Sequence, residues 1–79
     1  MPTSSSITDI TSSTHFQTIL SGNTYVIADF YADWCGPCKA IAPLFAQLAA
    51  AEAKVGKMAF VKVNVDTQQS VARTYGVSA

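Results

Sequence analysis

Three runs of apolar residues along the chain have the pattern of β-strands. The run 25–32 is apolar at nearly every position, which is typical of a strand buried on both faces of a parallel sheet. In the run 58–65, Val61 and Val63 point to one side, while Phe60 and Lys62 point to the other. A shorter run, residues 7–10, predicts a third strand.

Residues with helical spacing lie between and after these runs. Phe16, Ile19 and Leu20 define one face of a helix that ends near Gly22. A longer helix follows residue 34, and we expect its inward stripe to consist of Ile41, Leu44, Phe45, Leu48 and Ala49. In a third helix, capped by Asp66 or Thr67, the inward residues are Val71, Ala72 and Tyr75.

The order of these elements is β-α-β-α-β-α, which predicts an α/β domain over residues 7–79. Parallel strands with right-handed crossovers place helices on both faces of the sheet. Residues 1–6 are polar and predict a flexible leader.

Composition narrows the range of functions. Five basic residues balance five acidic ones, so nothing indicates a nucleic-acid or anionic membrane partner. No apolar run approaches the roughly 20 residues that span a bilayer. The first residues lack the basic and apolar regions of a secretory signal. Two cysteines in a chain without such a signal favour a reducing compartment. We therefore expect a cytoplasmic protein.

The segment Trp34-Cys35-Gly36-Pro37-Cys38 carries the candidate chemistry. Two cysteines lie where a strand gives way to a helix, and free backbone N–H groups at a helix start stabilise a thiolate. Cys35 is therefore the expected nucleophile, and Cys38, one turn inward, is the expected resolving thiol. Gly36 and Pro37 set the loop geometry, and Trp34 is expected to shield the site and to contact a protein substrate.

Two other interpretations of the cysteine pair are possible. A structural disulfide closing so short a loop removes little entropy from the unfolded chain, so it adds little stability. A zinc site needs four ligands, and the chain offers only these two cysteines and a distant His15. We therefore expect neither a structural role nor a bound metal.

Two charged residues in the strands complete the candidate site. Asp29 is a carboxylate in an otherwise apolar strand, where an unpaired charge is costly. We expect it to be buried and to accept the proton of Cys38. Lys62, in the neighbouring strand, is the expected partner of Asp29.

The chain resembles the thioredoxin family over residues 7–79. The segment Ala28 to Lys39 with Pro43 is similar to the family's active site, and Phe60 to Asp66 is similar to its central strand. The resemblance implies a thioredoxin-like fold and a protein-disulfide reductase, with Cys35 as nucleophile, Cys38 as resolving thiol, and Asp29 with Lys62 as the proton-accepting pair. It implies no bound cofactor beyond the redox-active disulfide. Electrons would come from NADPH through a thioredoxin reductase, and the substrates would be disulfide-containing proteins.

The sequence departs from the family pattern at its C-terminus, after the segment Val77-Ser78-Ala79. Family members continue into a cis-proline loop, a β-hairpin and a last helix, so we interpret residues 7–79 as a truncated domain. Without the hairpin, strand 25–32 is expected to be an exposed apolar edge, which predicts self-association or domain swapping. The alternative to an oxidoreductase is an inactive fragment, or an interaction module of a larger protein.

Overall fold

The computed structural model describes residues 6–77, so the predicted leader, apart from Ser6, lies outside the described residues. Its strands are β1 (Ile7–Asp9), β2 (Tyr25–Tyr31) and β3 (Met58–Asn64), all parallel and in the order β1-β3-β2. Its helices are α1 (Ser13–Gly22), α2 (Gly36–Glu52) and α3 (Gln69–Thr74). The predicted β-α-β-α-β-α order and the parallel sheet are confirmed.

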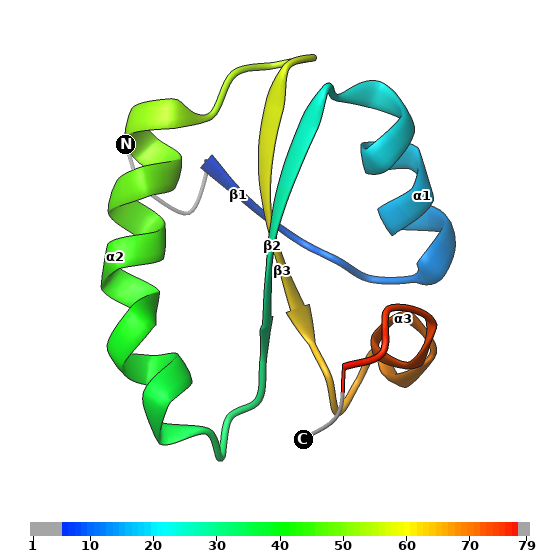
Figure 1. Ribbon diagram of the computed structural model, residues 1–79, viewed down its shortest axis with the longest axis vertical. Coiled ribbons are helices and arrows are strands. Elements are labelled where there is room, and N and C mark those ends of the chain that lie inside the picture. Colours follow the sequence, from blue (N-terminus) through cyan, green and yellow to red (C-terminus); the bar gives the residue numbers. More distant parts are fainter. Residues whose placement is uncertain (1–5, 78–79) are drawn as a thin grey trace.

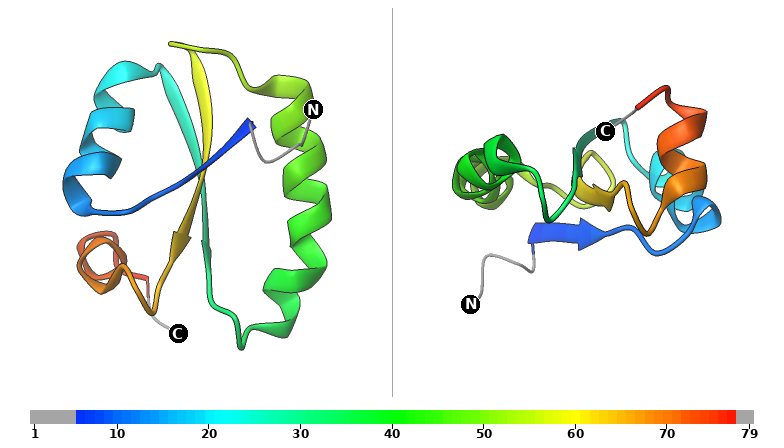
Figure 2. Two further views of the ribbon diagram at one scale, coloured as in Figure 1. Left: turned by 180° about the vertical axis from the view of Figure 1, so that it is seen from behind. Right: turned by 90° about the horizontal axis from the view of Figure 1, so that it is seen from below.

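The sheet is the middle of three layers. α2 covers one face, while α1 and α3 lie together on the other (Figures 1 and 2). The register places Ile27 opposite Phe60, and Ala28 opposite Val61. Side chains alternate along a strand, so the odd-numbered residues of β2 and the even-numbered residues of β3 face α2.

Each face of the sheet has its own core cluster. On the α1/α3 face, the buried residues are Ile10, Phe16, Val61, Val63 and Val71. The cluster under α2 is smaller and consists of Phe45, Ala49 and Phe60. The rings of Phe45 and Phe60 pack edge to face, with centroids 5.6 Å apart. α2 is therefore anchored to the sheet by few buried side chains.

Within residues 6–77, β2 lies at an edge of the sheet, as predicted. The expectation that this strand is buried on both faces is wrong: none of its seven residues is fully buried, and Tyr25 is 57% and Ile27 41% exposed. Both side chains are on the α2 face, by the register with Met58 and Phe60. The single helix on this face packs on Phe60 of the central strand and leaves the edge strand partly uncovered.

The inward stripe predicted for α2 is only partly correct. Phe45 and Ala49 are buried, but Ile41, Leu44 and Leu48 are each more than half exposed. A helix on one sheet face buries a narrow stripe, and here Phe45 and Ala49 fill it. The other three residues form an apolar flank with no partner among the described residues.

The cap predicted for the third helix is also wrong. α3 begins at Gln69, after Gln68, which makes no side-chain cap hydrogen bond. The preceding turn is held by Asn64, whose Oδ1 accepts the backbone N–H groups of Asp66 and Thr67. Asp66 therefore does not cap α3, and its side chain contacts the site described below. Among residues 6–77, no helix is long and apolar enough to cross a membrane.

Candidate functional site

The two cysteines lie at the carboxyl end of β2, where α2 begins. Cys35 is the N-cap residue of α2, and Gly36 and Pro37 form its first positions. Proline suits this place because the first N–H groups of a helix have no intrahelical partner. The backbone N–H of Cys35 donates to Ala32 O at 3.1 Å, which fixes the loop against the end of the strand.

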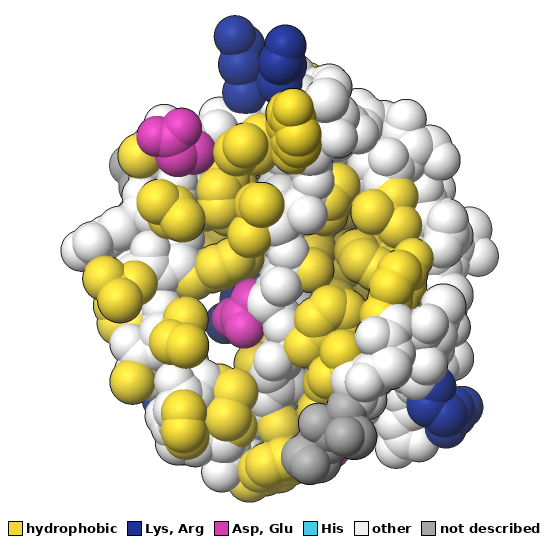
Figure 3. Space-filling view, viewed as in Figure 1, with side chains coloured by type: hydrophobic (Ala, Val, Ile, Leu, Met, Phe, Trp, Pro, Cys, Tyr) yellow, Lys and Arg dark blue, Asp and Glu magenta, His cyan; other side chains and the backbone are white. Residues whose placement is uncertain are grey.

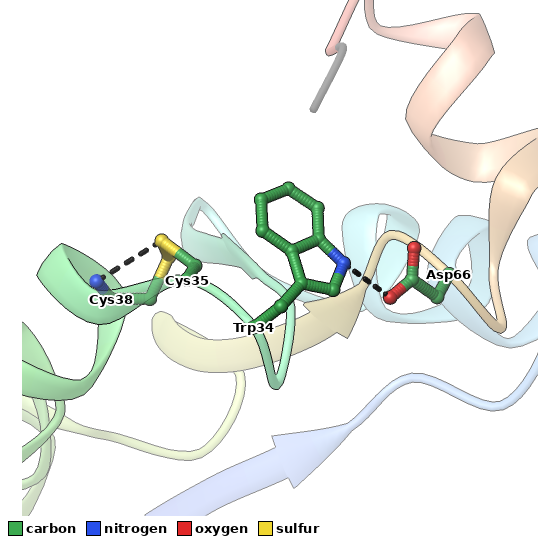
Figure 4. The surroundings of a disulfide bond; sticks show 4 residues. All are labelled: Trp34, Cys35, Cys38 and Asp66. Carbon is green, nitrogen blue, oxygen red and sulfur yellow. Dashed lines mark hydrogen bonds between the residues drawn. A yellow bond between two sulfur atoms is a disulfide. The ribbon is translucent and has the colours of Figure 1, made fainter.

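Cys35 and Cys38 form a disulfide, with their Cα atoms 5.3 Å apart. The backbone N–H of Cys38 also donates to Sγ of Cys35, at an N–S distance of 3.2 Å (Figure 4). This sulfur thus takes the position of a capping acceptor at a helix N-terminus, where a negative charge is favoured.

The hydrogen bond distinguishes the two cysteines more clearly than burial does. Both cysteine residues are partly buried. Only Cys35 Sγ accepts a helix N–H. The predicted roles therefore rest on the position of each sulfur relative to the helix start.

Trp34 is held beside the disulfide by Asp66, which the sequence analysis proposed only as a cap of the third helix. Its indole Nε1–H donates to Oδ2 of Asp66 at 2.8 Å, across the gap between the β2–α2 loop and the end of β3 (Figure 4). Trp34 is 60% exposed. A large aromatic surface is thus fixed next to Cys35 while it stays open to a partner. The sequence offered one signal that Asp66 belongs to the site. Asp66 lies just after a predicted parallel strand, and functional sites of such sheets form at the carboxyl ends of the strands.

The structure brings Asp29 and Lys62 to the same cavity as Cys38. Asp29 lies opposite Lys62 in the register of β2 and β3, and both side chains face α2. A cavity of about 150 Å³ is lined by these two residues and by Cys38, together with Tyr31, Ala32, Asp33, Lys39 and Ala42. A water molecule occupies about 30 Å³ in the liquid, so the cavity has room for several.

Two expectations about this charged pair are wrong. Asp29 is partly exposed rather than buried, because β2 is an edge strand and the cavity beside the carboxylate is open. The predicted ion pair with Lys62 is not formed, since the Lys62 ammonium lies over the ring of Tyr31, 4.5 Å from its centroid. Tyr31 is the next residue after Asp29 on this face of β2, and the face of its ring attracts the ammonium.

The structure supplies no candidate metal site around the cysteines. Within residues 6–77, no three His, Cys, Asp or Glu side chains are grouped so that they could hold an ion. The structure thus places a disulfide at the carboxyl end of a parallel strand, at the start of a helix, in an α/β fold of thioredoxin-like topology.

Comparison with known proteins identifies the family. The Thioredoxin family model matches residues 6–79, and the chain belongs to the thioredoxin family. It is 51% identical over 76 residues to a thioredoxin of Neurospora crassa, a match that covers 96% of this chain and 60% of that protein. A thioredoxin-like protein of Fusarium culmorum is also 51% identical, over 89% of this chain and 58% of its own length. The chain therefore spans about three fifths of the length of these relatives.

Solved structures agree with the family assignment. Mitochondrial thioredoxin 3 of Saccharomyces cerevisiae, in its oxidised form, superposes with a TM-score of 0.84 at 36% identity, over 99% of this chain and 71% of that one. A thioredoxin of Plasmodium falciparum gives a TM-score of 0.82 at 39% identity, covering 91% of this chain and 68% of the other.

Proposed function

We propose that this chain is the redox-active part of a thiol–disulfide oxidoreductase that reduces protein disulfides. The observation that carries the proposal is the Cys35–Cys38 disulfide at the start of α2, with Cys35 Sγ as the acceptor of a helix N–H. A negative charge on Cys35 is stabilised there, and the thiolate is the nucleophile in disulfide exchange.

The reduced pair carries the two electrons that the reaction needs. The Cys35 thiolate attacks one sulfur of a target disulfide, which forms a mixed disulfide and releases the other target sulfur as a thiolate. Cys38 then loses its proton and attacks Sγ of Cys35. This step forms the Cys35–Cys38 disulfide and expels the second target sulfur, so the target gains two electrons and the protein loses two.

Asp29 is the proposed acceptor of the Cys38 proton. Its carboxylate and the Cys38 side chain line the same cavity, so water in this cavity could carry the proton between them. Lys62 lies opposite Asp29 in the register, and its ammonium over Tyr31 supplies positive charge near the carboxylate. We assign Lys62 a positioning role.

The partners follow from the same chemistry. Disulfide-containing proteins are the proposed substrates, and the exposed indole of Trp34 beside Cys35 gives them an apolar contact surface. Restoring the dithiol requires two electrons, which we propose come from NADPH through a thioredoxin reductase. We further propose that the protein acts in the cytoplasm, as part of electron transport and redox homeostasis.

The test is reduction of a protein disulfide, with insulin as the probe and dithiothreitol as the electron source. The wild-type chain should accelerate the reaction, and Cys35→Ser should abolish the acceleration. Cys38→Ser should instead accumulate a mixed disulfide that mass spectrometry detects, because the resolving thiol is lost. If the folded wild-type chain gives no acceleration, the alternative of an inactive fragment or interaction module replaces the proposal.

A further inference from the structure

Three charged residues form a row across the sheet, on the face that α2 covers. Lys62 of β3 lies opposite Asp9 of β1 in one strand register and opposite Asp29 of β2 in the other. The lysine therefore has a carboxylate-bearing neighbour on each side. Opposite charges that face each other on adjacent strands attract, so an ion pair with one of the two aspartates is the arrangement that the register by itself favours.

The Lys62 ammonium has a different neighbour. Its Nζ lies over the ring of Tyr31, 4.5 Å from the centroid. A cation over an aromatic face is attracted by the electron-rich ring. Lys62 and Asp29 are both partly exposed, and an ion pair between residues in contact with water is a weak interaction. The ring can therefore compete with a carboxylate for the ammonium.

The position of Tyr31 makes this competition local. Tyr31 is the next residue after Asp29 on the same face of β2, because side chains alternate along a strand. Two residues of a strand span about 6.6 Å, and a lysine has a flexible four-carbon stem, so one ammonium can reach either group. Tyr31, Asp29, Lys62 and Cys38 line the same cavity of about 150 Å³. Figure 3 shows a hollow between α2 and β2 in which acidic and basic side chains are visible, bordered by hydrophobic ones.

We propose that Tyr31 is a positioning residue of the redox site, whose ring holds the Lys62 ammonium near Asp29 but out of an ion pair with it. The inference rests on the proposed function, in which Asp29 accepts the Cys38 proton. An ammonium in contact with a carboxylate favours the charged form of that carboxylate, which then accepts a proton less readily. By keeping the ammonium on its ring, Tyr31 leaves Asp29 the better proton acceptor when Cys38 attacks the mixed disulfide.

Other charged groups also surround Asp29 and must be separated from the effect of Lys62. A neighbouring cavity of about 470 Å³ is lined by Lys62 as well. The titratable and charged residues that line one or both cavities are Asp9 of β1, Asp29 and Tyr31 of β2, Asp33 of the loop after β2, Cys38 and Lys39 of α2, and Lys62 of β3. Lys39 lines both cavities and is a second ammonium near the carboxylate. A change that follows from removing the ring is therefore assigned to Lys62 only if it disappears together with Lys62.

The pH dependence of the resolving step tests the proposal. Stopped-flow mixing of the reduced chain with an aromatic disulfide, whose thiolate product is coloured, separates the two steps: attack by Cys35 releases the first thiolate, and attack by Cys38 releases the second. Tyr31→Leu frees the ammonium to approach Asp29. The pH at which the second phase reaches half its maximal rate should fall by roughly half a unit, and the maximal rate should fall about twofold. Tyr31→Phe keeps the ring and should behave like the wild type.

A double-mutant cycle shows whether the ring acts through the ammonium. In a Lys62→Gln background, Tyr31→Leu should no longer move the half-maximal pH. Tyr25→Leu is the matched control, because Tyr25 lies on the same face at the other end of β2, and it should leave the pH profile unchanged. A shift of the same size with and without Lys62 would mean that the ring only supports the fold, and it would overturn the proposal.

A spectroscopic measurement tests the contact independently of turnover. Protons above an aromatic ring resonate upfield, so the ε-methylene protons of Lys62 should be shifted upfield in the wild-type chain and in Tyr31→Phe, but not in Tyr31→Leu. A wild-type chain without this shift would overturn the proposal even if Tyr31→Leu fails to fold. A wild-type chain that shows the shift but releases no second thiolate would overturn the proposed function, and with it the role of Tyr31, while the contact itself would be established.

Discussion

The anchoring of α2 by one aromatic pair makes a quantitative prediction. Phe60 is 2% exposed and packs edge to face on Phe45, in a cluster whose only other fully buried member is Ala49. Truncating a buried phenylalanine to alanine costs about 3–5 kcal/mol. A chain of 79 residues has a free energy of unfolding of roughly 4–12 kcal/mol. Phe60→Ala should therefore remove about a quarter or more of the stability.

A double-mutant cycle isolates the aromatic contact from the general loss of packing. Urea unfolding of Phe45→Ala, Phe60→Ala and the double variant should give a coupling energy of about 0.5–1.5 kcal/mol. Phe60→Leu, which keeps most of the volume, should cost less than about 1.5 kcal/mol. It provides a folded background if Phe60→Ala is too unstable to measure.

The effect should be confined to the α2 face. Val61 is also fully buried, but it belongs to the cluster under α1 and α3. Phe60→Ala should accelerate hydrogen exchange in α2 more than in α1, while Val61→Ala should do the reverse. A loss below about 1 kcal/mol for Phe60→Ala, or a coupling energy of zero, would refute this account of how the helix carrying the cysteines is held.

Three predictions concern the site itself. Because Trp34 is the single tryptophan, Asp66→Ala should change the fluorescence spectrum of Trp34 and lower its fluorescence anisotropy. Unchanged emission would show that the hydrogen bond from Trp34 Nε1 to Asp66 Oδ2 does not hold the ring in solution. Asp29→Asn should slow release of the Cys35 mixed disulfide at least about tenfold in single-turnover experiments, and an unchanged rate would remove Asp29 from the mechanism. In the reduced chain, alkylation followed by mass spectrometry should give Cys35 a thiolate pKa below the free value of about 8.5, with slower reaction at Cys38; equal reactivity would mean that the helix cap does not act on the sulfur.

The sequence by itself determined the order of the elements and the place of the cysteines. Periodicity of two and of 3.6 residues distinguished strands from helices, and the Cys35–Cys38 spacing at a strand–helix junction located the chemistry. These are local properties, because hydrophobic alternation and helix capping depend on neighbouring residues. The family resemblance, quoted on the same residues, agreed with them and is confirmed.

Only the tertiary structure decided which apolar and charged residues have partners. Periodicity placed Ile41, Leu44 and Leu48 on the buried side of α2, but how much of a helix face is covered depends on the width of the sheet beneath it. Similarly, a carboxylate such as Asp29 in an apolar strand is buried only if its strand is internal to the sheet, and β2 lies at an edge. The partners of Trp34 and Lys62, which are Asp66 and Tyr31, depend on the register of β2 with β3 and on the turn after β3. Local sequence does not encode these relations, because they arise from contacts between segments distant in the chain.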